Sequence, residues 1–232
     1  MKAILFDLDG TLLDIDINRF IHHYFNKLSD VITDVAGSSD DHDKIAGAFH
    51  AATAAMMRPH PGTTNREIFE DIFNREAGVE IEELLPIFER FYLEIFPSLA
   101  DGSGPSIGAH EAMAEASKHG LRIAVATNPV FPLAAVIERM RWAGISPDAA
   151  HVITSYENMY ACKPYPEYFL QTAQMLDVRP TDCLMVGDDP VLDLAAADVG
   201  MSTFFVGNST GAVADYRGTL ADLAQLIRQV CA

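Results

Sequence analysis

The chain begins with a short apolar run, residues 3–6, that ends directly in two aspartates, Asp7 and Asp9, and a glycine, Gly10. Such a run, closed by a glycine turn, is typical of a buried strand in a parallel sheet. Because residues i and i+2 of an extended segment point to the same side, both carboxylates gather at the carboxyl end of this strand. Open α/β sheets keep their ligand sites at that end. Two acids so close together need a cation, or a proton on one of them, although the same pattern also forms simple turns.

Three further strand-like runs each end in polar residues. They are 121–126 before Thr127 and Asn128, 151–155 before a loop that reaches Lys163, and 183–186 before Gly187, Asp188 and Asp189, with Asp193 one helical turn further on. Taken alone, a threonine or an aspartate is often a helix cap, and a loop lysine is often solvated. The hydroxyl of Thr127 and the free amides of its turn suit phosphate oxygens. Four strand ends that carry these residues in this order indicate one shared site.

These four strand ends resemble the four motifs of the haloacid dehalogenase superfamily of hydrolases, and within it the phosphatase-like members. The matching segments are Asp7-Leu8-Asp9-Gly10-Thr11, Thr127-Asn128, Lys163-Pro164, and Gly187-Asp188-Asp189 with Asp193. The resemblance runs from the first strand to the last, and the combination of four motifs is highly specific. It implies an α/β fold, in which a Rossmann-like parallel sheet forms the core and an all-helical cap domain is inserted.

The resemblance also implies a role for each motif residue in phosphoryl transfer. Asp7 attacks phosphorus and forms an aspartyl-phosphate, which splits one hydrolysis into two easier steps. Asp9 protonates the leaving oxygen and later deprotonates the attacking water. Lys163 contacts both Asp7 and the phosphoryl group, and Thr127 and Asn128 bind the remaining phosphoryl oxygens.

A Mg²⁺ cofactor is implied by the same resemblance. Its ligands are the side chains of Asp7 and Asp188 and the backbone carbonyl of Asp9, while Asp189 or Asp193 orients its waters. Such a hard cation offsets the repulsion between an anionic nucleophile and an anionic phosphoryl group. Members that displace halide from carbon lack a second aspartate at the place of Asp9, so a haloacid dehalogenase is not expected.

The resulting prediction is a Mg²⁺-dependent phosphatase for a small phosphomonoester, similar to phosphoglycolate phosphatases. An alternative is a phosphomutase of the β-phosphoglucomutase kind, which shares Asp7 and Asp9 but passes the phosphoryl group to a sugar hydroxyl. From another class, a phospho-accepting receiver module combines similar residues. Receivers place the acidic pair first in the chain and have no long helical insertion, which argues against that class. The substrate, the pathway and the oligomeric state stay open.

Composition limits the partners. The formal net charge of −17 argues against nucleic acid as a partner. A small phosphorylated metabolite remains compatible, because Mg²⁺ and Lys163 meet its charge locally. No apolar run approaches the roughly 20 residues that a membrane helix needs, so no membrane contact is expected. The first strand leaves no room for a signal segment, and three cysteines without metal-ligand spacing fit a reducing compartment, so we expect a cytoplasmic protein.

Residues 15–100 show helical rather than strand periodicity, with a more polar break at 37–41. We therefore predict a helical cap over 15–100 and a catalytic core formed by 1–14 and 101–232. Linkers near 13–17 and 100–105 would let the cap open and close. In the second half of the chain, helices and strands alternate, with helices expected at 107–119, from about Val130 over 133–143, at 167–175 and at 219–230, and a last strand at 203–206.

The loop 58–66 between two helical stretches holds two candidate substrate-binding residues, His60 and Arg66. Basic residues are scarce in this chain, with 16 Lys and Arg against 33 Asp and Glu, so a basic side chain in such a loop is notable. Cap loops of related enzymes face the phosphate site and contact the rest of the substrate. The alternative is a solvated turn in which Thr64 or Asn65 caps the next helix. Both interpretations stay open at this stage.

Overall fold

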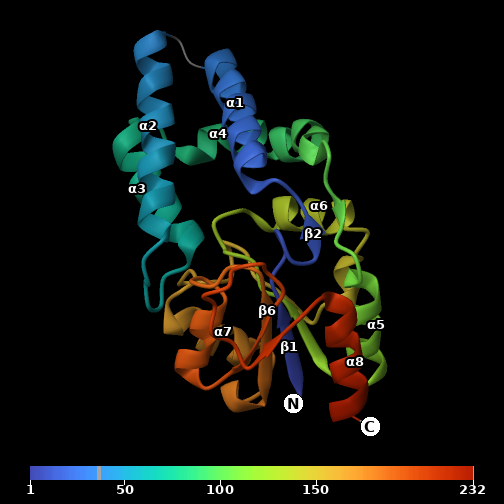
Figure 1. The fold of residues 1–232 in the computed structure, drawn as a ribbon. Helices are drawn as coiled ribbons and strands as arrows, with labels where there is room; N and C mark the ends of the chain where they lie inside the picture. Colours follow the sequence, from blue (N-terminus) through green and yellow to red (C-terminus); the bar gives the residue numbers. More distant parts are fainter. Residues whose placement is uncertain (36–37, 232) are drawn as a thin grey trace.

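The computed structural model describes residues 1–35 and 38–231 and shows a sheet flanked by helices, with a helical insertion above it (Figure 1). The strands are β1 (Ala3–Phe6), β2 (Leu13–Asp14), β3 (Gly104–Pro105), β4 (Arg122–Val125), β5 (Val152–Ile153), β6 (Cys183–Gly187), β7 (Ser202–Phe205) and β8 (Tyr216–Arg217). The helices are α1 (Ile17–Val35), α2 (Ser39–Met56), α3 (Asn65–Ala77), α4 (Ile81–Arg90), α5 (Ala109–Lys118), α6 (Leu133–Trp142), α7 (Pro166–Met175) and α8 (Leu220–Val230). Shorter π- and 3₁₀-helical segments are η1 (Phe91–Ile95), η2 (Phe96–Ala100), η3 (Pro147–Ala149), η4 (Pro180–Asp182) and η5 (Leu194–Val199).

The main sheet has the strand order β5-β4-β1-β6-β7-β8, and each neighbouring pair of strands is parallel. Strand β1 lies between β4 and β6, with Ala3 opposite Arg122 on one side and Cys183 on the other. The carboxyl ends of β1, β4 and β6 therefore meet at one edge of the sheet. This arrangement confirms the predicted α/β fold with a Rossmann-like parallel sheet.

Strand β1 is fully buried because helices cover both faces of the sheet. Ile4 and Phe6 contribute to a core that includes residues of α5, α6 and α8. Ala3 and Leu5 contribute to a second core that includes residues of α7. A strand with both faces covered must be apolar throughout, which explains why residues 3–6 read as a continuous hydrophobic run.

The segment between β2 and β3 is helical, as its periodicity predicted (Figure 1). Helices α2 and α3 pack against each other, and α1 packs against α2 and the η1–η2 segment. Of the break expected at 37–41, Ser38 is the N-cap of α2 and residues 39–41 already belong to that helix, while residues 36–37 lie outside the described part of the chain. An aromatic cluster centred on Phe20 and Phe96 ties α1 to η2, with their rings 5.8 Å apart. Among the helices that the structure describes, none has the length and apolar character of a membrane span.

The two predicted linkers pair with each other. Leu13 lies opposite Pro105, so that β2 and β3 form a short antiparallel ribbon where the chain leaves and re-enters the core. Strands of two residues carry no alternation that a sequence pattern can reveal, and the same holds for β8. The helix expected from about Val130 begins instead at Leu133, because Pro132 occupies the N-cap and keeps the residue before it extended.

Candidate active site

The loops that follow β1, β4, β5 and β6 border a cleft of about 370 Å³ at the carboxyl edge of the sheet. The motif residues that line it are Asp7, Asp9, Gly10, Thr127, Asn128, Lys163, Asp188, Asp189 and Asp193. Segments separated by more than 150 residues in sequence are thus brought together by the parallel sheet. In the structure, the motif residues of the predicted site lie together around this cleft, while their roles in catalysis stay predictions.

Lys163 lies at the centre of the charged cluster and is 1% exposed. Its Nζ donates to Asp7 Oδ1 at 2.7 Å and to Asp193 Oδ1 at 2.6 Å. Burial alone would lower the pKa of Lys163, but the charges of Asp193 and Asp7 outweigh it and raise that pKa. The ammonium group therefore stays charged beside Asp7, where it can attract an anionic substrate group.

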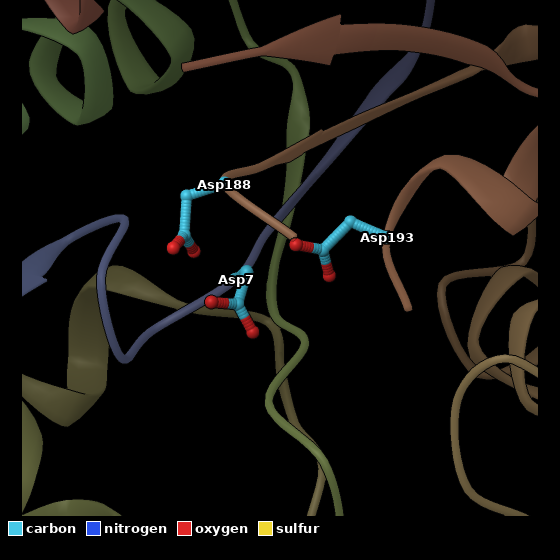
Figure 2. A group of neighbouring side chains, drawn as sticks. All are labelled: Asp7, Asp188 and Asp193. Carbon is cyan, nitrogen blue, oxygen red and sulfur yellow. The ribbon is translucent and has the colours of Figure 1, made fainter. Parts of the chain in front are cut away.

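The carboxyl groups of Asp7, Asp188 and Asp193 lie close together, as Figure 2 shows, and Lys163 contacts two of them, Asp7 and Asp193. Each offers an oxygen, and these oxygens lie within 4.8 Å of one another. Burial, and then the charge of Asp193, raises the pKa of Asp188; burial also raises the pKa of Asp7 well above its usual range, against the opposing charge of Lys163. Three acids around one lysine leave excess negative charge. A hard divalent cation with oxygen ligands fits this donor set.

Two glycines make room for these carboxylates. Gly10 adopts a φ of +84°, and a Cβ atom there would lie 2.5 Å from Asp188 Oδ2. A Cβ atom on Gly187 would overlap the carboxylate of Asp193. Thr11, next to Gly10, donates from Oγ1 to Asp188 Oδ1 at 3.0 Å. The turn after β1 is therefore shaped around the carboxylate delivered by β6.

The loop after β4 is fixed by hydrogen bonds to neighbouring segments. Asn128 Oδ1 accepts from the backbone N–H of Lys163 at 3.1 Å, which links the second motif to the third. The carbonyl of Thr127 accepts from Thr154 at 2.8 Å and from the Tyr168 hydroxyl at 2.9 Å. These bonds hold Thr127 and Asn128 at the cleft in a defined orientation.

Asp189 and Asp193 are the two candidates from the sequence for orienting the waters of the cation, and their hydrogen bonds in the structure differ. Asp189 Oδ1 accepts from the backbone N–H groups of Val191 at 2.7 Å and Leu192 at 2.9 Å, so it stabilises the turn after β6. Asp193 binds Lys163 through Oδ1 and accepts from the Asp189 N–H through Oδ2 at 3.0 Å. Of the two, Asp193 belongs to the buried carboxylate cluster.

His60 and Arg66 do not line the cleft. The His60 ring bonds to the carbonyl of Ala55 through Nε2 at 2.7 Å, and Arg66 Nε donates to Glu70 at 2.6 Å. Thr64 is the N-cap of α3 and forms a capping box, which is one of the two expected alternatives. The structure therefore does not bring His60 and Arg66 to the cleft, because the His60 ring is engaged by α2 and the Arg66 side chain by α3.

The same loop attaches the helical insertion to the core. Asn65 is fully buried, and its Nδ2 donates to the carbonyl of Pro129 at 2.9 Å. Three backbone N–H groups of the loop donate to core carbonyls: His60 to Tyr160 at 2.7 Å, Asn65 to Met159 at 2.7 Å and Arg66 to Tyr156 at 2.8 Å. The polar residues of this loop serve attachment rather than the cleft.

Arg139 is a residue of the cleft that sequence reasoning missed. It lies on α6, is 1% exposed and forms an ion pair with Asp9. Its neighbours on the buried face of α6 are Ala135, Val136 and Met140. An arginine at i+3 and i+4 spacing from apolar residues is the signal that could have revealed a buried, paired cation.

A parallel α/β sheet with clustered acids and a buried lysine at its carboxyl edge can bind a cation and an anionic group side by side. The family model for haloacid dehalogenase-like hydrolases matches residues 1–199. The chain belongs to this family. The resemblance drawn from the four motifs is thereby confirmed.

Individual relatives agree with this assignment. A phosphoglycolate phosphatase from Xylella fastidiosa (strain 9a5c) is 28% identical over 203 residues, which cover 84% of this chain and 75% of the relative. A putative phosphatase, YhcW, from Bacillus subtilis (strain 168) is 27% identical and covers 97% of this chain and 94% of its own. The crystal structure of a HAD phosphatase from Thermococcus onnurineus superposes with a TM-score of 0.60 at 23% identity and covers 98% of both chains. The last likeness concerns the fold.

Proposed function

We propose that this chain is a Mg²⁺-dependent phosphatase that hydrolyses a small phosphomonoester through an aspartyl-phosphate on Asp7. The enzyme class, a phosphoric monoester hydrolase, follows from the family and from the phosphatases among its relatives. The observation that carries the mechanism is the placement of Asp7 at the end of β1, with Lys163 Nζ 2.7 Å from its carboxylate and two further acids beside it.

In the first step, a carboxylate oxygen of Asp7 bonds to phosphorus as the bond from phosphorus to the leaving oxygen breaks. A carboxylate needs no base to become a nucleophile, unlike a serine hydroxyl. Lys163 holds Asp7 and attracts the phosphoryl group, and Thr127 and Asn128 supply donors for its other oxygens. The fixed backbone around Thr127 supports this role, since pre-oriented donors cost little reorganisation.

Asp9 moves the protons. It protonates the leaving oxygen in the first step and then takes a proton from the water that attacks phosphorus. In that second step the bond between Asp7 and phosphorus breaks, which releases inorganic phosphate and restores both aspartates. The position of Asp9 two residues after Asp7, in the wall of the same cleft, supports this assignment.

The cation would be held by the carboxylates of Asp7 and Asp188 and by the backbone carbonyl of Asp9, with Asp193 beside them. When bound, Mg²⁺ supplies positive charge that offsets the repulsion between Asp7 and the phosphoryl group. The buried carboxylate cluster supports this reading, because its charge exceeds what Lys163 alone can balance.

The helical insertion, residues 15–100, would act as a cap over a core formed by 1–14 and 101–232. Support comes from the cleft itself, where Ile15, Ile17 and Ile21 stand opposite the charged strand ends. An apolar wall of this kind excludes water from the reacting phosphoryl group. The substrate would be a small phosphorylated metabolite, with phosphoglycolate as the first candidate because of the relative from Xylella fastidiosa.

The test is hydrolysis of p-nitrophenyl phosphate and of a panel of short phosphorylated acids and sugars, followed by release of inorganic phosphate. Activity should require Mg²⁺, disappear with a chelator and return when the metal is restored. Asp7→Asn should lower kcat by roughly 10⁴-fold or more, the scale of removing a hydrolase nucleophile. Asp148→Asn, at an exposed turn, is the matched control and should keep full activity.

Undiminished activity in a cleanly purified Asp7→Asn protein would contradict the mechanism. Isomerisation of a sugar phosphate without release of phosphate would instead indicate a phosphomutase. Either result is distinguishable from the expected one by measuring phosphate and sugar in the same reaction.

A further inference from the structure

Arg139 is a buried cation that the proposed chemistry does not yet use. Its Nη1 contacts Asp9 Oδ2 in an ion pair, although the two residues lie 130 positions apart in the chain. The arginine is 1% exposed, and the side chain of Asp9 is 14% exposed. An arginine is expensive to bury, so a pair at this depth needs close and well-oriented partners.

Aromatic rings and a backbone carbonyl hold the guanidinium group in place. Its central carbon lies 4.6 Å from the ring centroid of Phe131 and 5.9 Å from that of Phe20. Its Nε donates to the carbonyl of Ala135 at 3.4 Å. Phe131 follows the second motif, and Phe20 belongs to α1 of the helical insertion. The guanidinium is thus held between the core and the insertion at the position where it contacts Asp9.

The two oxygens of Asp9 have different environments. Oδ2 contacts Arg139 and lies 3.5 Å from Thr127 Oγ1. Oδ1 is buried and has no hydrogen-bond partner among the described residues. A buried carboxylate oxygen without a partner is costly unless a substrate group or a water supplies one. The pairing of Oδ2 therefore leaves Oδ1 as the oxygen available to exchange a proton.

We propose that Arg139 is a positioning residue for Asp9: it holds Oδ2 and thereby orients Oδ1 toward the leaving oxygen of the substrate. This inference rests on the proposed function, in which Asp9 transfers the proton. The proton moves between Asp9 Oδ1 and the leaving oxygen, and Arg139 keeps all of its own protons. Arginine suits this task because its planar guanidinium, held between the rings of Phe20 and Phe131, presents Nη1 to Asp9 Oδ2 in one fixed orientation.

The first experiment compares leaving groups in Arg139→Met and Arg139→Lys. For an alkyl phosphate, whose leaving oxygen needs a proton, Arg139→Met should lower kcat by about 10²-fold, the cost of misplacing a reacting group by about 1 Å. For p-nitrophenyl phosphate the loss should be several-fold smaller, and KM should change little for both substrates. Arg139→Lys keeps the charge without the planar group that the aromatic rings orient, and it should give an intermediate loss.

Arg141→Met is the matched control. Arg141 lies on the same helix, pairs with Glu138 on the surface, and its side chain is 65% exposed. This variant should behave as the wild type on both substrates. Equal losses for both leaving groups in Arg139→Met would overturn the proposal in favour of a general structural role.

The second experiment combines Arg139→Lys with Asp9→Asn, and it remains decisive if Arg139→Met does not fold. Residues that act as a unit are not additive. In the Asp9→Asn background, Arg139→Lys should therefore lower kcat by less than about twofold. Losses that multiply would overturn the proposal. If the wild type hydrolyses no phosphomonoester, the proposed function fails, whereas an active wild type with multiplying losses removes only the role of Arg139.

Discussion

At the carboxyl edge of the sheet, charged side chains are buried and contact one another, whereas in the loop 58–66 they contact their own helix and backbone. Lys163 is 1% exposed and binds two carboxylates that arrive from different strands. Arg66 is 43% exposed and pairs with Glu70 one helical turn further along α3. A cation thus becomes a site residue when distant segments converge on it, and the scarcity of basic residues in the sequence is a weaker guide.

The same contrast between the cleft and the loop distinguishes Asp9 from His60. Asp9 lines the cleft, while His60 bonds to the carbonyl of Ala55 near the end of the preceding helix α2. Asp9→Asn should lower kcat for an alkyl phosphate by about 10²–10⁴-fold, the usual contribution of general acid–base catalysis. His60→Ala should leave kcat and KM for the preferred substrate within about twofold, as for a surface change away from the site. Steady-state kinetics on both variants checks the pair, and a raised KM in His60→Ala would return the loop to the site.

A second pair of variants compares how much Lys163 and Arg66 contribute to the free energy of unfolding. Lys163→Met leaves Asp7 and Asp193 buried without their shared partner and should lower the free energy of unfolding by about 3–5 kcal/mol in a chelator. Arg66→Ala removes an exposed pair and should cost about 0.2–0.5 kcal/mol. Urea unfolding with circular dichroism measures both. Similar losses for the two variants would mean that burial does not separate the regions as described.

Metal binding provides a third and smaller effect. Because burial raises the pKa values of Asp7 and Asp188, the uncompensated carboxylates oppose folding near neutral pH. Mg²⁺ at 100 times its dissociation constant should stabilise the protein by about 2.7 kcal/mol. Thermal denaturation at increasing Mg²⁺ should show a rising Tm in the wild type and no rise in Asp188→Asn. A metal-dependent rise that persists in Asp188→Asn would locate the cation elsewhere.

Much of the site could be predicted from the sequence because its residues follow strands directly. Asp7 and Asp188 each come within two residues of a buried apolar run, and the parallel sheet then brings those runs together. Arg139 lies in the middle of a helix, where no turn or glycine marks it, and only its place on the apolar face of α6 hints at burial. The β2–β3 ribbon was missed because its strands are too short for a pattern.

The loop 58–66 illustrates the remaining gap. Its composition allowed both a cap of α3 and a contact with substrate, and Thr64 was one of two residues expected to cap the helix. The observed position of the loop depends on tertiary contacts. Its backbone N–H groups donate to the carbonyls of Met159 and Tyr160 in the core, and its side chains bond to residues outside the cleft. Local sequence does not encode that docking.

The proposed mechanism requires that Asp7 becomes phosphorylated during turnover. Borohydride reduces an acyl phosphate to an alcohol, so it converts a phosphorylated aspartate to homoserine. The wild type and Asp9→Asn should be quenched during turnover of saturating p-nitrophenyl phosphate, whose leaving group needs little help from Asp9, and then reduced, digested and examined by mass spectrometry. The expected result is homoserine at position 7, more abundant in Asp9→Asn because hydrolysis of the intermediate is slowed. Homoserine at Asp188 or Asp193, or an unmodified Asp7 in both proteins while phosphate is still released, would contradict the mechanism.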